Sequence, residues 1–203
     1  EKNTLEDFNA ETYTLPNNYQ SVENITALER GMSSNYTQAA VLSEALASLY
    51  KEGDLRLDAY FKAADKNGYR FSQKSGKDDF RCSFRVGEMY LNSAEAAAQS
   101  DQLPQARTRL LELMQKRYTP EAYTVKATAV NAMNKEALIQ EILDERAREL
   151  AFEGHRWFDL RRTTRPRIEK VLKGGTYVLE QDDSRYTIQI PREAIAANPE
   201  LSN

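Results

Sequence analysis

One stretch constrains this chain of 203 residues more than any other: residues 145–162, which read ERARELAFEGHRWFDLRR. Apolar side chains recur around it at steps of three and four residues, a spacing that predicts a buried helical stripe. The stripe comprises Ile139, Ile142, Leu143, Ala147, Leu150, Ala151, Gly154 and Phe158. We therefore expect one long helix over residues 134–163, with Asn134 as its N-cap.

Three acidic residues, Glu145, Glu149 and Glu153, lie four residues apart on a neighbouring face of this helix. Carboxylates stacked in this way repel one another unless basic side chains from elsewhere answer them. We therefore predict a buried network of arginines and carboxylates that locks the helix against its neighbours. The sequence also offers local pairs, which are Asp144 with Arg148, Glu153 with Arg156, and Asp159 with Arg162.

Two functional interpretations of the same stretch are less well supported. A glycosidase-like pair of carboxylates fits the spacing, but neighbouring arginines lower carboxyl pKa values and suit neither a general acid nor a shared proton. A nucleic-acid-binding helix fits the seven arginines of residues 146–167, but interleaved acids cancel their field and the net charge is −3, so we predict no nucleic-acid partner. Trp157 is expected to anchor the core; a sugar-stacking platform is the alternative.

The residues that carry most enzyme chemistry are scarce. His155 is the only histidine and Cys82 the only cysteine, which excludes a histidine triad and a thiolate metal cluster within the chain. No glycine-rich phosphate loop precedes a long helix. We predict no catalytic residue, no metal and no cofactor, and we expect Cys82 to be a small buried side chain. No apolar run approaches the roughly 20 residues that span a bilayer.

The rest of the chain predicts a mainly α fold with tetratricopeptide-like helical hairpins, a small β-hairpin and long loops. Residues 84–118 give two helices joined by a short turn, with small residues where they cross, as in one tetratricopeptide-like hairpin. The remaining segments are residues 1–50, irregular with a short helix from residue 39; a ribbon of the runs YRF and FRCSF; a connector over residues 119–133; a helical turn at RIEKVL; and residues 176–203, a hairpin of YVLE and RYTIQI with a tail.

The run from Glu145 to Arg162 follows E-x-x-x-E-x-x-x-E-G-x-R-W-x-D-x-R-R, and it resembles the helix that marks the SusD/RagB family. Three further segments match in the family's order: EGDLRLDAYF, FRVGEMYLNSAEAAAQ and IQIPREAIAANPELSN. In the second of them, Gly87 replaces the usual alanine. Together the matches cover approximately residues 50–203.

The resemblance implies a nutrient-binding lipoprotein on the outer membrane of Bacteroidetes-type bacteria. It implies that the chain is the C-terminal part of a larger protein, since the lipid-anchoring cysteine and the N-terminal helix pairs of the family are absent from it. The family's partners are oligosaccharides or other nutrients and a SusC-like TonB-dependent transporter. We therefore expect a binding protein without enzyme activity.

Sugar binding rests on aromatic faces that stack on the sugar rings, with polar side chains bonding the hydroxyl groups. The irregular regions supply four candidates, Tyr13, Tyr19, Tyr36 and Tyr69, for each of which a loop or core role is the alternative. From a different class, a tetratricopeptide-type adaptor would bind peptides in a helical groove. That adaptor predicts repeated hairpins, and the sequence shows one copy.

Overall fold

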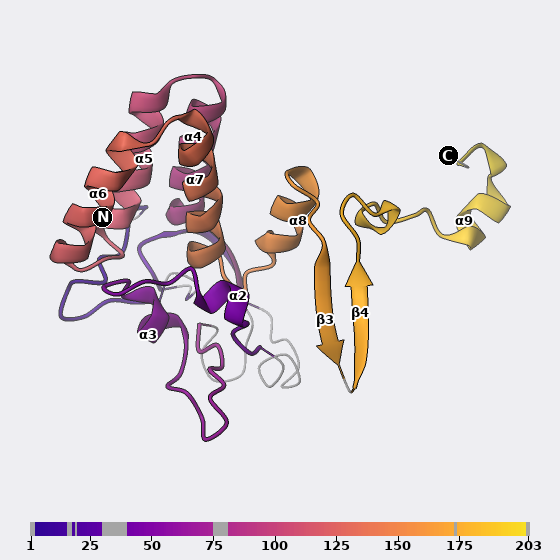
Figure 1. The fold of residues 1–203 in the computed structure, drawn as a ribbon, viewed down its shortest axis with the longest axis horizontal. Coiled ribbons are helices and arrows are strands. Elements are labelled where there is room, and N and C mark those ends of the chain that lie inside the picture. The colour runs from indigo at the N-terminus through magenta and orange to yellow at the C-terminus, as the bar shows by residue number, and fades with distance from the viewer. Residues whose placement is uncertain are drawn as a thin grey trace. The chain divides into compact units, whose positions relative to one another are not determined.

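The computed structural model describes residues 3–15, 18, 20–29, 40–74, 81–172 and 174–201 (Figure 1). The chain divides into two compact units, residues 1–155 and 156–203, and each is considered by itself. Unit 1 holds β1 (Asn24–Glu29), α2 (Glu44–Ala47), α3 (Arg56–Tyr60), β2 (Arg81–Arg85), α4 (Val86–Gln99), α5 (Leu103–Gln115), α6 (Pro120–Ala132) and α7 (Lys135–Glu149). Unit 2 holds α8 (His155–Arg162, beginning on the last residue of unit 1), β3 (Ile168–Leu172), β4 (Gly175–Leu179), the 3₁₀ turns η1 (Ser184–Tyr186) and η2 (Pro199–Leu201), and α9 (Arg192–Ala197).

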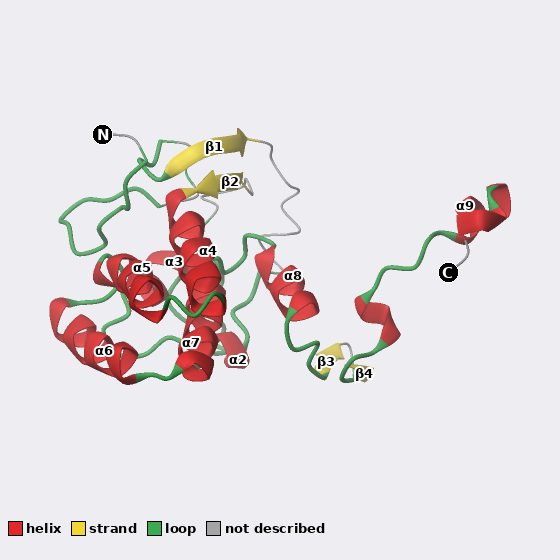
Figure 2. Cartoon of the chain, turned by 90° about the horizontal axis from the view of Figure 1, so that it is seen from above, coloured by secondary structure: helices red, strands yellow, loops and turns green. Residues whose placement is uncertain are grey.

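Helices α4 to α7 form the main body of unit 1, and they lie side by side in both ribbon views (Figures 1 and 2). The hairpin of α4 and α5 is closely packed because Ala94, Ala98 and Ala106 are small and fully buried, which lets two helix axes approach. Helix α7 packs against α4, and α6 packs against α5. The core of these helices contains Leu91, Leu110, Leu113, Met114, Val130, Leu138 and Ile142. The predicted mainly α fold with helical hairpins is confirmed.

Helix α6 replaces the connector that was predicted over residues 119–133. The side chain of Thr119 accepts a hydrogen bond from the backbone N–H of Ala122, and Pro120 occupies the first turn. Those two residues are therefore the N-cap and the preorganised first position of a helix. Asn134 caps α7 in the same way, as expected, through a 2.9 Å bond from the N–H of Ala137.

The single helix predicted over residues 134–163 is wrong, because α7 ends at Glu149 and α8 begins at His155. Phe152 and Gly154 in the intervening turn have φ values of 62° and 86°, which a helix does not allow. Phe152 contacts Phe61 in a second, smaller core, at 5.6 Å between ring centres. The predicted apolar stripe ends at this turn, since Gly154 is exposed and Phe158 is 63% exposed.

Both two-stranded sheets differ from the predicted hairpins. β2 contains most of FRCSF, but it pairs antiparallel with β1 and not with YRF; Cys82 lies opposite Leu28 in this ladder, and its side chain is outside the described set. β3 contains most of RIEKVL, so this segment is a strand and not a helical turn. It pairs antiparallel with β4. The hairpin turn is therefore at Gly174, with φ 79°, before YVLE and not after it, and RYTIQI contributes only the end of η1. The expected helix from residue 39 is reduced to the four residues of α2.

Candidate functional site

The three acids of the predicted column lie inside a network of ion pairs, here called the buried ionic lattice. Glu145 and Glu149 are on α7, whereas Glu153 is in the turn that follows it. Its members are Glu23, Asp54, Arg56, Lys74, Arg85, Arg117, Glu145, Arg148, Glu149 and Glu153. Glu149 is the centre, and it accepts hydrogen bonds from three fully buried guanidinium groups. The closest contacts are 2.6 Å from Arg85, 3.0 Å from Arg117 and 3.1 Å from Arg56. Burial alone would raise the pKa of Glu149, but the charges of these arginines hold it well below its usual range.

The other two members of the column have their own partners. Glu145 lies 2.7 Å from Arg56 and 2.6 Å from Arg148, and these charges outweigh burial and lower its pKa to about 2. Glu153 lies 2.9 Å from Arg85 and also pairs with Lys74, with the same effect on its pKa, about 2. All three carboxylates are thus held charged.

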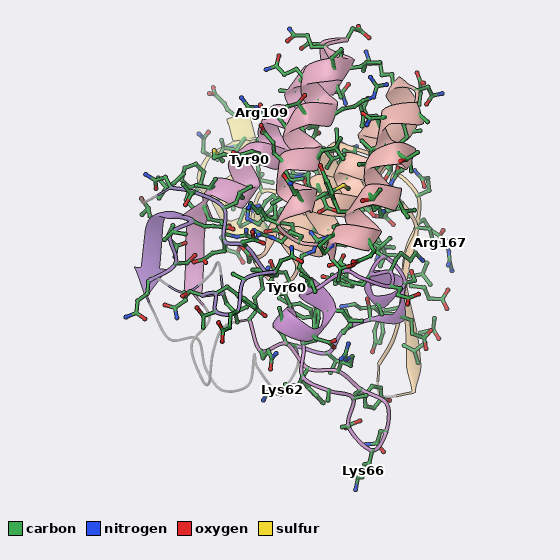
Figure 3. All side chains as sticks on the ribbon, turned by 90° about the vertical axis from the view of Figure 1, so that its left-hand side faces the viewer. Tyr60, Lys62, Lys66, Tyr90, Arg109 and Arg167 are labelled. Atoms are coloured by element: carbon green, nitrogen blue, oxygen red, sulfur yellow. The ribbon has the colours of Figure 1, made fainter. Side chains whose placement is uncertain are left out.

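Lys74 connects the lattice to the end of α7. Its ammonium donates to the carbonyl oxygen of Glu149, at 2.6 Å, which is at the C-terminal end of α7, and to that of Ala151 in the following turn, at 3.2 Å. It lies 4.0 Å from the ring centre of Tyr60, which is labelled in Figure 3. Burial lowers the pKa of Lys74 to about 8, although the charge of Glu153 acts in the opposite direction.

This geometry confirms the predicted network of arginines and carboxylates and disfavours the glycosidase-like interpretation. A general acid needs a carboxyl group that keeps its proton near neutral pH, and these carboxyl groups do not. The local pairs were predicted less well. Asp159 and Arg162 do pair, at 2.7 Å. Arg148 pairs with Glu141 and Glu145 instead of Asp144, and Glu153 pairs with Lys74 and Arg85 instead of Arg156.

Of the four candidate tyrosines, the structure describes Tyr13 and Tyr69; Tyr19 and Tyr36 lie outside the described residues. Tyr13 is 40% exposed, and its ring stacks on buried Phe8 with 4.5 Å between centres and 22° between planes. The guanidinium carbon of Arg117 lies 4.5 Å from the same Phe8 ring. Tyr13 is therefore the outer layer of a stack that begins in the buried ionic lattice.

Tyr69 is 55% exposed and lies in the loop between α3 and β2. Its backbone N–H donates to Oδ1 of Asp65, at 2.9 Å, in a turn whose tip carries Lys66 (Figure 3). The structure gives no contact that brings Tyr69 and Tyr13 together among the described residues, so they are two separate exposed rings.

A groove along α6 was missed by sequence reasoning, because residues 119–133 were taken as a connector. Its volume is about 790 Å³, and its lining is mostly apolar. Tyr118, 1% exposed, and Val125, 71% exposed, belong to this lining. The other lining residues are Lys51, Glu52, Gly53, Thr119, Glu121, Ala122, Lys126 and Ala129. Thr119-Pro120 was the available signal for the helix.

Unit 2 has a smaller pocket of about 210 Å³ on one face of its hairpin. Ile168, Lys170, Tyr177, Val178, Leu179 and Arg185 line it. Beside the hairpin, Trp157 stacks on Tyr186 with 5.1 Å between ring centres and 7° between planes. Trp157 is half-buried, and that stack anchors α8 to η1 within unit 2.

Within the part of the chain that the structure describes, no group of three or more histidine, cysteine, aspartate or glutamate side chains is placed to hold a metal ion. No described helix combines the length and the apolar character needed to cross a membrane.

Packed helical hairpins, joined to the rest of unit 1 by a buried lattice of arginines and carboxylates, define a helical scaffold. The chain belongs to the SusD family (SusD_RagB), which it matches over residues 8–203. No curated protein matches it.

Two solved structures share the fold. A SusD-like carbohydrate-binding protein from Bacteroides vulgatus is 17% identical, with a TM-score of 0.59 over 91% of this chain and 49% of its own. A SusD superfamily protein from Bacteroides fragilis is 21% identical, with a TM-score of 0.62 over 94% of this chain and 49% of its own. The chain therefore spans about half the length of these two proteins.

Proposed function

We propose that this chain contributes to the binding of a glycan or a related nutrient, with Tyr13 and Tyr69 as stacking platforms. Family membership over residues 8–203 supports this class of function, and the Bacteroides vulgatus structure is that of a carbohydrate-binding protein. Tyr19 and Tyr36 remain candidates for the same role.

The observation that carries the proposal is the stack of Tyr13 on Phe8. A sugar ring binds an aromatic face best when that face is exposed and already immobile, since little conformational freedom is then lost. Phe8 is 5% exposed and has the Tyr60 ring edge-on at 5.8 Å, so the support beneath Tyr13 is rigid. Tyr69 is more exposed, but only a turn positions it.

The same proposal includes the place where the protein acts and the partner to which it passes its ligand. The protein binds its ligand at the cell surface, at the outer membrane, and delivers it to a SusC-like TonB-dependent transporter. In this proposal the protein acts without catalysis and without a cofactor. The ion pairs of Glu145, Glu149 and Glu153 argue against a glycosidase-like use of these three carboxylates. Hydrolysis of a polysaccharide by the purified protein would contradict this part.

The test is calorimetric titration of the chain with maltohexaose, cellohexaose and xylohexaose. We expect at least one of them to bind and Tyr13→Ala to weaken that binding about tenfold, as loss of one good aromatic contact does. Tyr90→Phe is the control, because Tyr90 is a partly buried ring beside Arg109 on the helical hairpin (Figure 3). Unchanged affinity in Tyr13→Ala would refute the assignment of Tyr13.

The groove along α6 favours a second candidate, the peptide-binding adaptor. An apolar groove of about 790 Å³ next to an exposed Val125 suits an amphipathic peptide better than a hydroxyl-rich sugar. If this candidate is correct, Val125→Asp abolishes capture of an amphipathic helical peptide and leaves sugar binding unchanged. If the glycan proposal is correct, the same peptide shows no binding to the wild-type chain.

A further inference from the structure

The β3–β4 hairpin of unit 2 has two unlike faces. Because side chains alternate along a strand, the register places Ile168, Lys170, Tyr177 and Leu179 on one face, where Lys170 lies directly opposite Tyr177. Ile168 and Leu179 are half-buried, whereas Lys170 is exposed and Tyr177 is 63% exposed. The face thus has an apolar floor that ends in an accessible ring and an ammonium group.

Arg185 also lines the pocket on this face of the hairpin. Its guanidinium donates to the carbonyl oxygen of Val178 in β4, at 2.9 Å, which holds it against the hairpin. Asp183 pairs with the same guanidinium at 2.6 Å and neutralises it. Among the residues that the structure describes, no carboxylate pairs with Lys170, so Lys170 supplies the uncompensated positive charge.

The charge of the whole unit acts in the same direction. Residues 156–203 contain nine basic and seven acidic side chains, whereas the complete chain has a net charge of −3. An anionic ligand is therefore attracted to unit 2 more than to the acidic remainder.

We propose that this pocket binds one anionic sugar residue, such as a uronic acid, with its ring on Tyr177 and its carboxylate on Lys170. This inference rests on the proposed glycan-binding function and adds the class of sugar. An exposed aromatic face takes the apolar side of a sugar ring, and an ammonium group takes a carboxylate. A volume of about 210 Å³ lies below the approximately 300–1,000 Å³ of sites for larger ligands, which fits a single sugar unit.

The test is calorimetric titration of the chain with the trimer of galacturonic acid and, in parallel, with neutral galactotriose. We expect the acidic trimer to bind more tightly, and its affinity to fall as sodium chloride is raised. Lys170→Ala weakens it about tenfold, since one charge-assisted hydrogen bond is lost, while Lys170→Arg retains most of the affinity. Tyr177→Ala weakens both trimers, whereas Tyr177→Phe, which keeps the ring, does not.

Arg192→Ala is the matched control. Arg192 is exposed, belongs to the same unit and carries the same charge, but it does not line the pocket. Equal losses of affinity in Lys170→Ala and Arg192→Ala would overturn the proposal in favour of a general charge effect, and unchanged affinity in Lys170→Ala would overturn it outright. This inference alone would be refuted if neutral sugars lose affinity in Tyr13→Ala while the acidic trimer binds Lys170→Ala as tightly as wild type. Failure of every sugar to bind would refute the proposed function as well.

Discussion

Oε1 of Glu149 lies 2.6 Å from Nη1 of Arg85, and both side chains are fully buried. Glu149 is the last residue of α7, and Arg85 is the last residue of β2. One ion pair therefore joins the helical body of unit 1 to its small sheet. The following predictions test what such contacts contribute.

Glu149→Gln should be strongly destabilising. The substitution removes the central negative charge and leaves three buried guanidinium groups short of a partner, which costs about 3–5 kcal/mol in the free energy of unfolding. Urea denaturation followed by circular dichroism measures this change. Glu112→Gln is the control, since Glu112 and Arg109 pair at 2.9 Å with 42% of each side chain exposed, and it should cost less than about 1 kcal/mol. Similar effects of the two variants would contradict a central role for the lattice.

Stability should fall in acid. The folded pKa values of Glu145 and Glu153 are about 2, below their ordinary value of 4.5. Their stabilising contribution is complete above pH 4.5 and is lost as the pH falls towards 2, because the unfolded chain then binds more protons than the folded one. We expect the free energy of unfolding at pH 3 to be at least about 2 kcal/mol lower than at pH 7, from urea midpoints at constant ionic strength. Equal midpoints at the two values would be inconsistent with these pKa values.

Gly87→Ala should destabilise the chain, although alanine is the better helix former by about 1 kcal/mol. A Cβ atom at position 87 would lie 2.5 Å from Nη1 of Arg85 and 3.0 Å from Oε1 of Glu149. The guanidinium would have to move away from its carboxylates, at a net cost of about 1–3 kcal/mol. Thermal and urea unfolding give the sign directly, and a stabilised variant would show that the lattice adjusts freely.

Gly154→Ala tests the turn between α7 and α8. No atom lies within 4 Å of an added Cβ, so the cost comes only from the φ of 86°. We expect about 1 kcal/mol for alanine and less for Gly154→Asn, because asparagine tolerates this conformation better. A neutral or stabilising effect of alanine would show that the positive φ at position 154 is not what ends the helical pattern here.

The sequence predicted the lattice but not its composition. Three acids spaced four residues apart cannot be buried without basic partners, so a network was required by electrostatics alone, although only Glu145 and Glu149 lie on α7 and Glu153 lies in the turn after it. Arg56, Arg85 and Arg117 come from three other segments, far from α7 in sequence, and only the tertiary fold selects them. For the same reason, nearby candidates such as Asp144 and Arg156 were misassigned.

Local patterns were least informative where two kinds of structure compete. The apolar residues of RIEKVL follow a helical spacing, yet the turn at Gly174 makes this segment a strand that pairs with β4. Helix α6 buries only Val130, so it shows almost no apolar stripe in the sequence. The exposure of Tyr13 and the pocket beside Tyr177 depend on packing and on strand register, neither of which composition specifies.

The most direct test of the scaffold and the binding site together is calorimetric titration of the tightest-binding neutral hexasaccharide into wild type, Tyr13→Ala and Glu149→Gln, at a temperature where all three are folded. The lattice stabilises the fold, whereas Tyr13 contacts the ligand. We therefore predict unchanged affinity in Glu149→Gln and affinity about tenfold weaker in Tyr13→Ala. The opposite pattern, with affinity lost in folded Glu149→Gln and retained in Tyr13→Ala, would contradict the account and place the binding site at the carboxylates of α7.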